Sequence, residues 1–534
     1  MIVSGDTFLS TAPTRHFDVA IVGAGTVGLC LASTLRKAGV SVVLLEAGGA
    51  SANASSNSDT ATSAGHPHEG TDIGRAAGLG GTSTLWAGQL VEFDPPDLSR
   101  KDSSWPISYA TLAGWYKKTY SALGVGPRPP LSAYQKEMGI EVDPDAAVEP
   151  LVTRWLPEPN FARIFADDVK SDMPVITGVE ASEITFDGDR AVAISGQTDA
   201  GETLRITADH IVLAASTIGN SRLALALQRQ PGCPWAENTF VGKYFQDHLG
   251  GAVGNVEVLD DAAFRNAFEH GKAFGQKFEP KFKATNSVSE QTQIGINGAF
   301  LFHSALHAHL SNLKQTVRAA RNGVLHSEIA SLPKDLARIG KSFVPLVKRY
   351  VMDRRVLGFY DQGVEFYVQS EQIPLYESCI ELDRNHQGSG LPKAIVNWKV
   401  DGREVDAIRQ FVEATGARLA DQGIAKMTPA PELAKRESGL SLLADTYHQA
   451  GGLRMSTASN QGVTDADGRI WNTKNVYVAG AAVMPSSSHA NVTLTGVALS
   501  LRLAAHLAAK IKQPTVTLAP TPLMVKKGHT VSAQ

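Results

Sequence analysis

The chain is poor in the features that mark several common protein classes. Its 534 residues include only three cysteines, Cys30, Cys233 and Cys379, which lie far apart and form no CxxC pair. Neither a disulfide framework nor a thiolate metal site is therefore indicated. A net charge of −3 leaves no electrostatic footprint for nucleic acid or anionic lipid, so we expect no nucleic-acid partner.

Long apolar runs are missing as well. No segment approaches the roughly 20 apolar residues of a membrane-spanning helix, and the first sixteen residues lack a basic stretch followed by an apolar one. We therefore expect a cytoplasmic protein without a membrane span. No internal repeat is visible. The chain is too long for one ordinary domain of about 150 residues, and we expect two interleaved domains.

The stretch 17–49 is the most informative part of the N-terminal half. It combines a buried-strand pattern, the glycines of Gly23-x-Gly25-x-x-Gly28, a helical pattern and a second strand that ends at Glu46. The glycines allow a tight turn, close approach of a diphosphate and close helix packing, and Glu46 can accept hydrogen bonds from ribose hydroxyls. This context predicts a dinucleotide site for NAD or FAD, and the acidic residue disfavours NADP.

A second glycine-rich loop, GLGGTSTLWAG, covers 78–88. Together with the N-terminal fingerprint it resembles the glucose–methanol–choline (GMC) oxidoreductase family, in which this loop folds over FAD. Trp86 makes the motif most similar to the pyranose-oxidase branch. In that branch a histidine tethers the flavin where this chain has Leu85, so the resemblance implies FAD bound without a covalent link.

The C-terminal motifs extend the resemblance. His448, followed by Gly451, Arg454 and Met455, is similar to the family motif H-x-x-G-x-x-R-M, which implies that His448 is the catalytic base. Alignment of the terminal helix implies that Asn491 occupies the second catalytic position, and that the neighbouring histidine at 489 does not.

A mechanism follows from this placement. Flavin oxidation of an alcohol needs removal of the hydroxyl proton and transfer of the carbinol hydrogen to flavin N5 as hydride. Neutral His448 can take the proton, because an imidazole titrates near neutrality, and Asn491 can orient the same oxygen. The N–H groups of Val492 and Thr493, at a helix N-terminus, would stabilise negative charge on the reduced flavin.

Two polar residues suggest where a substrate binds. Glu371 and Gln372 interrupt the apolar rhythm of a strand pattern at 365–374. Buried polar groups need partners, which a sugar could supply, although an ordinary exposed strand face explains the pattern equally well. His248, in a motif at the entry to the substrate domain, is as compatible with a structural role as with a functional one.

The predicted fold is α/β: a Rossmann-like FAD-binding domain, split in sequence, with an α+β substrate domain built on a large antiparallel sheet. We place the FAD-binding domain at 14–110 and 166–235, a covering segment at 111–165, the substrate domain at 236–445 with a helical insertion at about 262–355, the catalytic motifs at 446–515 and a tail at 516–534. The predicted FAD contacts are Gly23, Gly25, Thr26, Gly28, Glu46, Ala47, Gly80, Gly81, Thr82, Ser83, Leu85, Trp86, Ala87, Ala181, Ala215, Gly480, Ala481, Val492 and Thr493.

The resemblance implies an FAD-dependent enzyme that oxidises a hydroxyl of a sugar or glycoside, most simply a secondary ring hydroxyl. Other alcohols (a polyol, an inositol, a sugar acid or a sterol-like alcohol) and a redox-silent flavin lyase of the same fold remain alternatives. No step needs a metal. The electron acceptor, oxygen or a quinone or redox protein, and the oligomeric state stay open.

Overall fold

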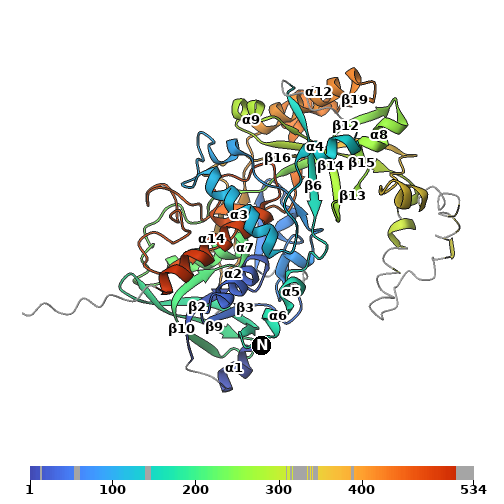
Figure 1. Cartoon of the computed structure of the whole chain (residues 1–534). Helices are drawn as coiled ribbons and strands as arrows, with labels where there is room; N and C mark the ends of the chain where they lie inside the picture. The colour runs from blue at the N-terminus through green and yellow to red at the C-terminus, as the bar shows by residue number, and fades with distance from the viewer. Residues whose placement is uncertain are drawn as a thin grey trace, which may run out of the picture.

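The structure is a computed structural model. It describes residues 1–11, 15–52, 60–138, 146–307, 309–312, 316, 333–334, 337, 340, 347–386 and 390–512. Two bodies stand side by side in Figure 1: one holds β2, β3 and α2, and the other holds β12, β15 and β16 under α12. Each has its own hydrophobic core.

The first body is built on a sheet of eight strands among the described residues. Its centre is parallel: β7 (Val175–Thr177), β3 (Val42–Glu46), β2 (His16–Val22), β10 (Thr203–Leu213) and β22 (Val476–Val478). The antiparallel strands β9 (Arg190–Thr198) and β8 (Val179–Asp187) continue it beyond β10, and β1 (Ile2–Ser4) closes the other edge. The sheet thus draws on three distant parts of the chain, as a sequence-split domain requires.

Apolar runs explain the central strands. Every residue of β3 and the last four of β2 are buried, which is the pattern of a parallel strand covered on both faces. The covering helices include α2 (Thr26–Lys37), α3 (Tyr109–Ala122), α7 (Ser216–Gln228) and α14 (Val492–Lys512). This arrangement confirms the predicted α/β class with a Rossmann-like domain.

Among the described residues one helix, α14, is long and apolar enough to cross a membrane, and 67% of its most apolar window is buried. It packs against α2 and α3. In this fold α14 is therefore a core helix of the first body.

The second body is built on a largely antiparallel sheet of nine strands among the described residues. Its order is β19 (Ala425–Pro429), β12 (Leu249–Val258), β16 (Gly363–Ser370), β15 (Ile296–His303), β14 (Gln276–Ala284), β6 (Val148–Trp155) and β5 (Gln89–Leu90); β20 (Ala444–Asp445) pairs with β12 and β13 (Gly271–Ala273) with β14. Helix α12 (Arg403–Asp421) covers one face, where Phe411 meets Phe366 with ring centroids 6.0 Å apart.

A five-stranded sheet brings together β21 (Ala450–Gly452), β11 (Lys243–Gln246), β17 (Cys379–Leu382), β18 (Ala394–Trp398) and β4 (Ala61–Gly65). Because β11 leads into residues 247–248 and β21 follows residue 448, this sheet fixes the spacing of the two histidines described below.

The predicted helical insertion at 262–355 needs correction. Between α8 (Asp261–Phe268) and residue 303 the chain forms β13, β14 and β15 together with the short α9 (Asn286–Thr292), so this part belongs to the sheet. Alternating buried and partly exposed residues along β14 are the strand signal that the sequence interpretation overlooked. Most of 313–346, within the predicted insertion, lies outside the described residues, as does the tail at 516–534.

Candidate active site

The N-terminal fingerprint forms a cleft between two glycine loops. Helix α2 begins after Gly25, whose cap position has no side-chain hydrogen bond, so the first N–H groups of the helix remain available to an anion. Gly25 faces Gly81 of the second loop, and a Cβ on Gly81 would lie 2.9 Å from the Gly25 Cα. The two loops therefore pack so closely that a side chain at Gly81 would not fit without a shift of the backbone.

Glu46 ties this cleft together. Its carboxylate accepts the backbone N–H groups of Ala24 at 2.7 Å, Gly48 at 2.9 Å and Gly78 at 2.8 Å. Glu46, which we expect to bind a ribose hydroxyl, therefore also holds the surrounding backbone in place. A carboxylate has about four acceptor positions, so one remains for a ribose hydroxyl.

Two cavities of about 230 Å3 and 430 Å3 run through this region, and Thr26 and Thr82 line both of them. Residues at the start of α2 would hold the diphosphate of an elongated cofactor, and residues of the second cavity would hold its ring. The predicted residues that line the first cavity are Gly23, Gly25, Thr26, Glu46, Ala47, Gly81, Thr82, Ala181 and Ala215. Those that line the second are Thr26, Thr82, Ser83, Leu85, Trp86, Ala87, His448, Asn491 and Thr493.

Other predicted residues line neither cavity: Gly28, Gly80, Gly480, Ala481 and Val492. Gly28 acts in packing, since a Cβ there would lie 1.9 Å from the carbonyl oxygen of Gly23. Ser216 adopts φ +67°, a left-handed conformation that favours glycine.

The proposed catalytic pair is in contact. The Nδ2 atom of Asn491 lies 2.8 Å from Nε2 of His448, and both residues line the 430 Å3 cavity. Asn491 directly precedes α14, while His448 directly follows Tyr447, which has φ +64°. Residues 43 positions apart in sequence thus meet on one wall of the cavity.

A hydrogen-bond chain fixes the tautomer of His448. The Nε2 atom of His248 lies 3.2 Å from the carbonyl oxygen of Ser487, which can only accept, so Nε2 carries the hydrogen. The bare Nδ1 of neutral His248 and the hydroxyl oxygen of Thr446, 3.1 and 2.8 Å from Nδ1 of His448, can then both accept its hydrogen. His448 therefore presents an unprotonated Nε2 to Asn491, and His248 is a positioning residue for it.

Burial keeps both imidazoles neutral. It lowers the pKa of His448 to about 3, with the neighbouring His248 and the positive charge of Lys281 acting in the same direction. It also lowers the pKa of His248 to about 4. The pKa of His448 therefore lies below the near-neutral value expected from the sequence, because the sequence does not reveal how deeply the ring is enclosed.

Asp247 supports this arrangement. Its Oδ1 accepts the backbone N–H groups of His248 at 2.7 Å and His448 at 2.8 Å, and its Oδ2 lies 3.1 Å from Nε2 of His68. Burial favours the neutral acid, but the hydrogen bond from His68 and nearby imidazoles hold the pKa of Asp247 below its usual range. His68 itself is buried.

His489 lies elsewhere. It is buried, its Nε2 is 3.0 Å from the Asp94 carboxylate, and it does not line the 430 Å3 cavity. Burial opposes ionisation of Asp94, but the hydrogen bond from His489 and the charge of Lys283 hold the Asp94 pKa well below its usual range. His489 therefore belongs to a buried ionic cluster.

The expectation that a sugar partners Glu371 and Gln372 needs correction. Glu371 binds Arg100 at 2.8 Å and accepts the backbone N–H of Gly295 at 2.9 Å. Gln372 accepts from Trp398 Nε1 at 2.7 Å and donates to a backbone carbonyl at 2.8 Å. Neither lines the cavity of His448, because both lie just beyond the end of β16 and meet protein groups there.

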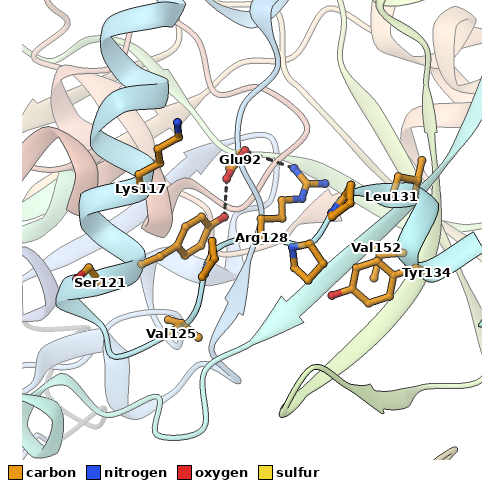
Figure 2. A pocket seen from close by; sticks show the side chains of 12 residues that line it. Glu92, Lys117, Ser121, Val125, Arg128, Leu131, Tyr134 and Val152 are labelled. Carbon is orange, nitrogen blue, oxygen red and sulfur yellow. Dashed lines mark hydrogen bonds and ion pairs between the residues drawn. The ribbon is translucent and has the colours of Figure 1, made fainter.

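A cavity of about 700 Å3, larger than either described above, lies between α3 and β6 and contains no predicted site residue. Figure 2 shows Glu92 and Arg128 pointing toward one another across it, 3.4 Å apart. Tyr120 also donates to Glu92 at 2.7 Å. Size alone therefore does not identify the reactive site.

Two protein-family models match the chain: an FAD dependent oxidoreductase model over residues 18–232 and a GMC oxidoreductase model, for the C-terminal domain, over residues 374–500. The first spans the fingerprint and both glycine loops. The second spans both catalytic candidates.

Named relatives include a 2-methyl-1,2-propanediol dehydrogenase of Mycolicibacterium austroafricanum, 23% identical over 487 residues and 79% of each chain. A C-glycoside 3-oxidase of Microbacterium trichothecenolyticum is 29% identical over 133 residues, 24% of each chain.

Solved structures share the fold. The formate oxidase of Aspergillus oryzae matches with a TM-score of 0.56 and 15% identity, covering 94% of this chain and 99% of that one. A fungal aryl-alcohol oxidase matches with a TM-score of 0.57 and 14% identity, covering 93% and 99%. The two family matches and the named relatives show an FAD-dependent oxidoreductase of the GMC type that acts on alcohol groups, and the solved structures show the shared fold.

Proposed function

We propose that this enzyme oxidises a secondary hydroxyl of a sugar or glycoside, with His448 as the base and Asn491 as the orienting group. The observation that carries the proposal is their 2.8 Å contact on the wall of the 430 Å3 cavity, beside the glycine loop predicted to cover the flavin. Bound FAD would supply the hydride acceptor. Side chains of the protein would carry out the remaining steps.

The tautomer of His448 suits it to the task. Its bare Nε2 can accept a hydroxyl proton, while the amide of Asn491 donates to the oxygen that loses it. A substrate hydroxyl would thus replace the direct contact between the two side chains. Proton uptake at Nε2 makes the ring cationic, and the carboxylate of Asp247 nearby favours that charge.

Two relatives bear on the identity of the substrate. The C-glycoside 3-oxidase resemblance favours a sugar ring, whereas the relative with the longest match reported above is a dehydrogenase of a small diol. A small vicinal diol is therefore the second candidate. We also propose that the flavin is held without a covalent bond, because Leu85, which lines the cavity, has no nucleophilic atom.

The test is anaerobic mixing of the holoenzyme with single sugars, glycosides and short diols while flavin absorbance is followed. Bleaching by a sugar or glycoside supports the proposal, and bleaching only by short diols would select the second candidate. No bleaching by any alcohol would point to a redox-silent lyase. His448→Ala, with its flavin content checked, identifies whether the loss lies in chemistry or in cofactor binding.

A further inference from the structure

Two amide side chains from the second body hold the segment that leads to Asn491. The backbone carbonyl oxygen of His489 accepts a hydrogen bond from Nδ2 of Asn297 at 2.7 Å and another from Nε2 of Gln369 at 2.8 Å. A carbonyl oxygen has two lone pairs, so both of them are used. His489 stands two residues before Asn491, and these bonds involve its main chain and not its imidazole.

Strand pairing places the two amides side by side. Asn297 of β15 and Gln369 of β16 lie directly opposite each other in the antiparallel register. Because side chains alternate along a strand, both project from the face opposite to that of Phe366, which packs on α12. Asn297 and Gln369 are only 3% and 8% exposed. Buried amides need hydrogen-bond partners, and the carbonyl of His489 supplies one to each.

The turn around Ser488 is fixed as well. Ser488 has φ +60°, a conformation that costs a non-glycine residue energy and persists where its surroundings hold it. Its N–H donates to Glu371 at 3.1 Å, and its hydroxyl donates to Asp97 and accepts the N–H of Ala490 at 3.3 Å. Arg100 bridges the two carboxylates, at 2.7 Å from Asp97 and 2.8 Å from Glu371. Glu371 therefore stabilises this turn.

Asn491 thus lies between two fixed parts of the chain. The carbonyl of His489 is held on one side, and on the other side α14 begins at the buried residue Val492. A side chain between two such points has few orientations open to it. The contact of its amide with His448 at 2.8 Å therefore depends on the bonds that hold the carbonyl.

We propose that Asn297 and Gln369 are positioning residues for the reaction: by holding the His489 carbonyl they set the angle at which the Asn491 amide meets the reacting hydroxyl. The inference rests on the proposed function, which assigns that role to Asn491. A displacement of about 1 Å at an orienting group can lower a rate by about 10²-fold. The two amides should therefore act on the limiting rate, because they do not line the cavity and so do not bind the substrate.

The test is stopped-flow reduction of the flavin in Asn297→Leu, Gln369→Met and the double variant. The probe is whichever of D-glucose, methyl β-D-glucoside and propylene glycol reduces the wild-type flavin fastest. Each single variant leaves the carbonyl one donor, so we expect the limiting rate to fall by about 3- to 10-fold, and by about 100-fold in the double variant. The apparent Kd should stay within about threefold of the wild-type value, as for an interaction that acts in the transition state.

The Asn491→Ala background separates positioning from a general loss of structure. If the amides act through Asn491, adding Asn297→Leu or Gln369→Met to Asn491→Ala should slow reduction no further. Asn238→Leu is the matched control, because the Asn238 amide also donates to a backbone carbonyl, that of Gly462 at 3.0 Å, and the residue does not line the cavity. Its limiting rate should be normal. FAD content and melting temperature show whether each variant folds.

The outcomes separate the two proposals. Normal limiting rates in the single and double amide variants, or an equal further loss of rate in the Asn491→Ala background, would overturn the inference while alcohol oxidation stands. If Asn491→Ala reduces the flavin at the normal rate, or if no alcohol reduces the wild-type flavin, the proposed function fails and the inference fails with it. The single variants, which keep one donor each, decide the question if the double variant loses its FAD.

Discussion

Acidification is the most discriminating perturbation of the proposed base. In the folded enzyme burial lowers the pKa of His448 to about 3, so the ring stays neutral and able to accept a proton well below pH 6. The sign is clear: a lowered imidazole pKa extends the active, neutral form towards acid. We therefore expect the limiting rate of flavin reduction to remain constant at acidic pH values at which an enzyme with an exposed histidine as base would lose most of its rate.

The size of the effect can be worked out. With an ordinary imidazole pKa of about 6.5, only about 3% of the base would be neutral at pH 5, and the rate would fall about 30-fold from its value at pH 8. With a pKa of about 3, about 99% stays neutral at pH 5 and the rate changes by only a few per cent.

The assay is stopped-flow reduction of the flavin at saturating substrate from pH 8 to pH 4. His448→Ala should lower the rate by about 10²- to 10⁴-fold at every pH, as removal of a general base typically does, and should keep its FAD. His489→Ala should reduce at a nearly normal rate, since His489 lies outside the cavity. An apparent pKa near 6.5 that disappears in His448→Ala would refute the burial argument, and normal reduction by His448→Ala would refute its role as base.

Three further predictions concern the cofactor and stability. Acid precipitation should leave a colourless pellet and a yellow supernatant, because Leu85 cannot form a bond to the flavin; a yellow pellet would show another attachment. Glu46→Ala should lower both FAD content and melting temperature, since three backbone N–H groups lose their acceptor at about 1–3 kcal/mol each; full FAD at an unchanged melting temperature would contradict this. Burial lowers the pKa of His210 to about 4. Below about pH 6.5 the unfolded chain therefore takes up a proton that the folded chain excludes, and the free energy of unfolding decreases as the pH is lowered. This site should cost about 2 kcal/mol at pH 5 relative to pH 8, and urea unfolding of His210→Leu at the two pH values should show a correspondingly smaller loss.

Local sequence patterns were enough to predict that the protein binds FAD. The glycines at 23, 25 and 28 and the carboxylate at 46 lie within one strand–helix–strand unit, whose geometry follows from backbone rules that act over a few residues. The second glycine loop and the motif around His448 are also short and continuous. The structure brings His448 and Asn491 into contact, and their catalytic roles stay a prediction.

Only the tertiary structure decided how those residues are tuned. The tautomer and pKa of His448 depend on His248, on the Ser487 carbonyl and on the depth of burial, none of which a sequence pattern encodes. Glu371 showed the same limit, since its polar character suggested a substrate contact until Arg100, 271 residues away, proved to be its partner.

The contact between Gln89 and Glu279 could not be predicted from the sequence, for the same physical reason. Gln89 and Glu279 are 190 residues apart and meet because β5 and β14 both flank β6 in one sheet. Short-range backbone preferences determine which segments become strands, but the order of the strands, and hence which side chains share a cavity, depends on the packing of the whole chain.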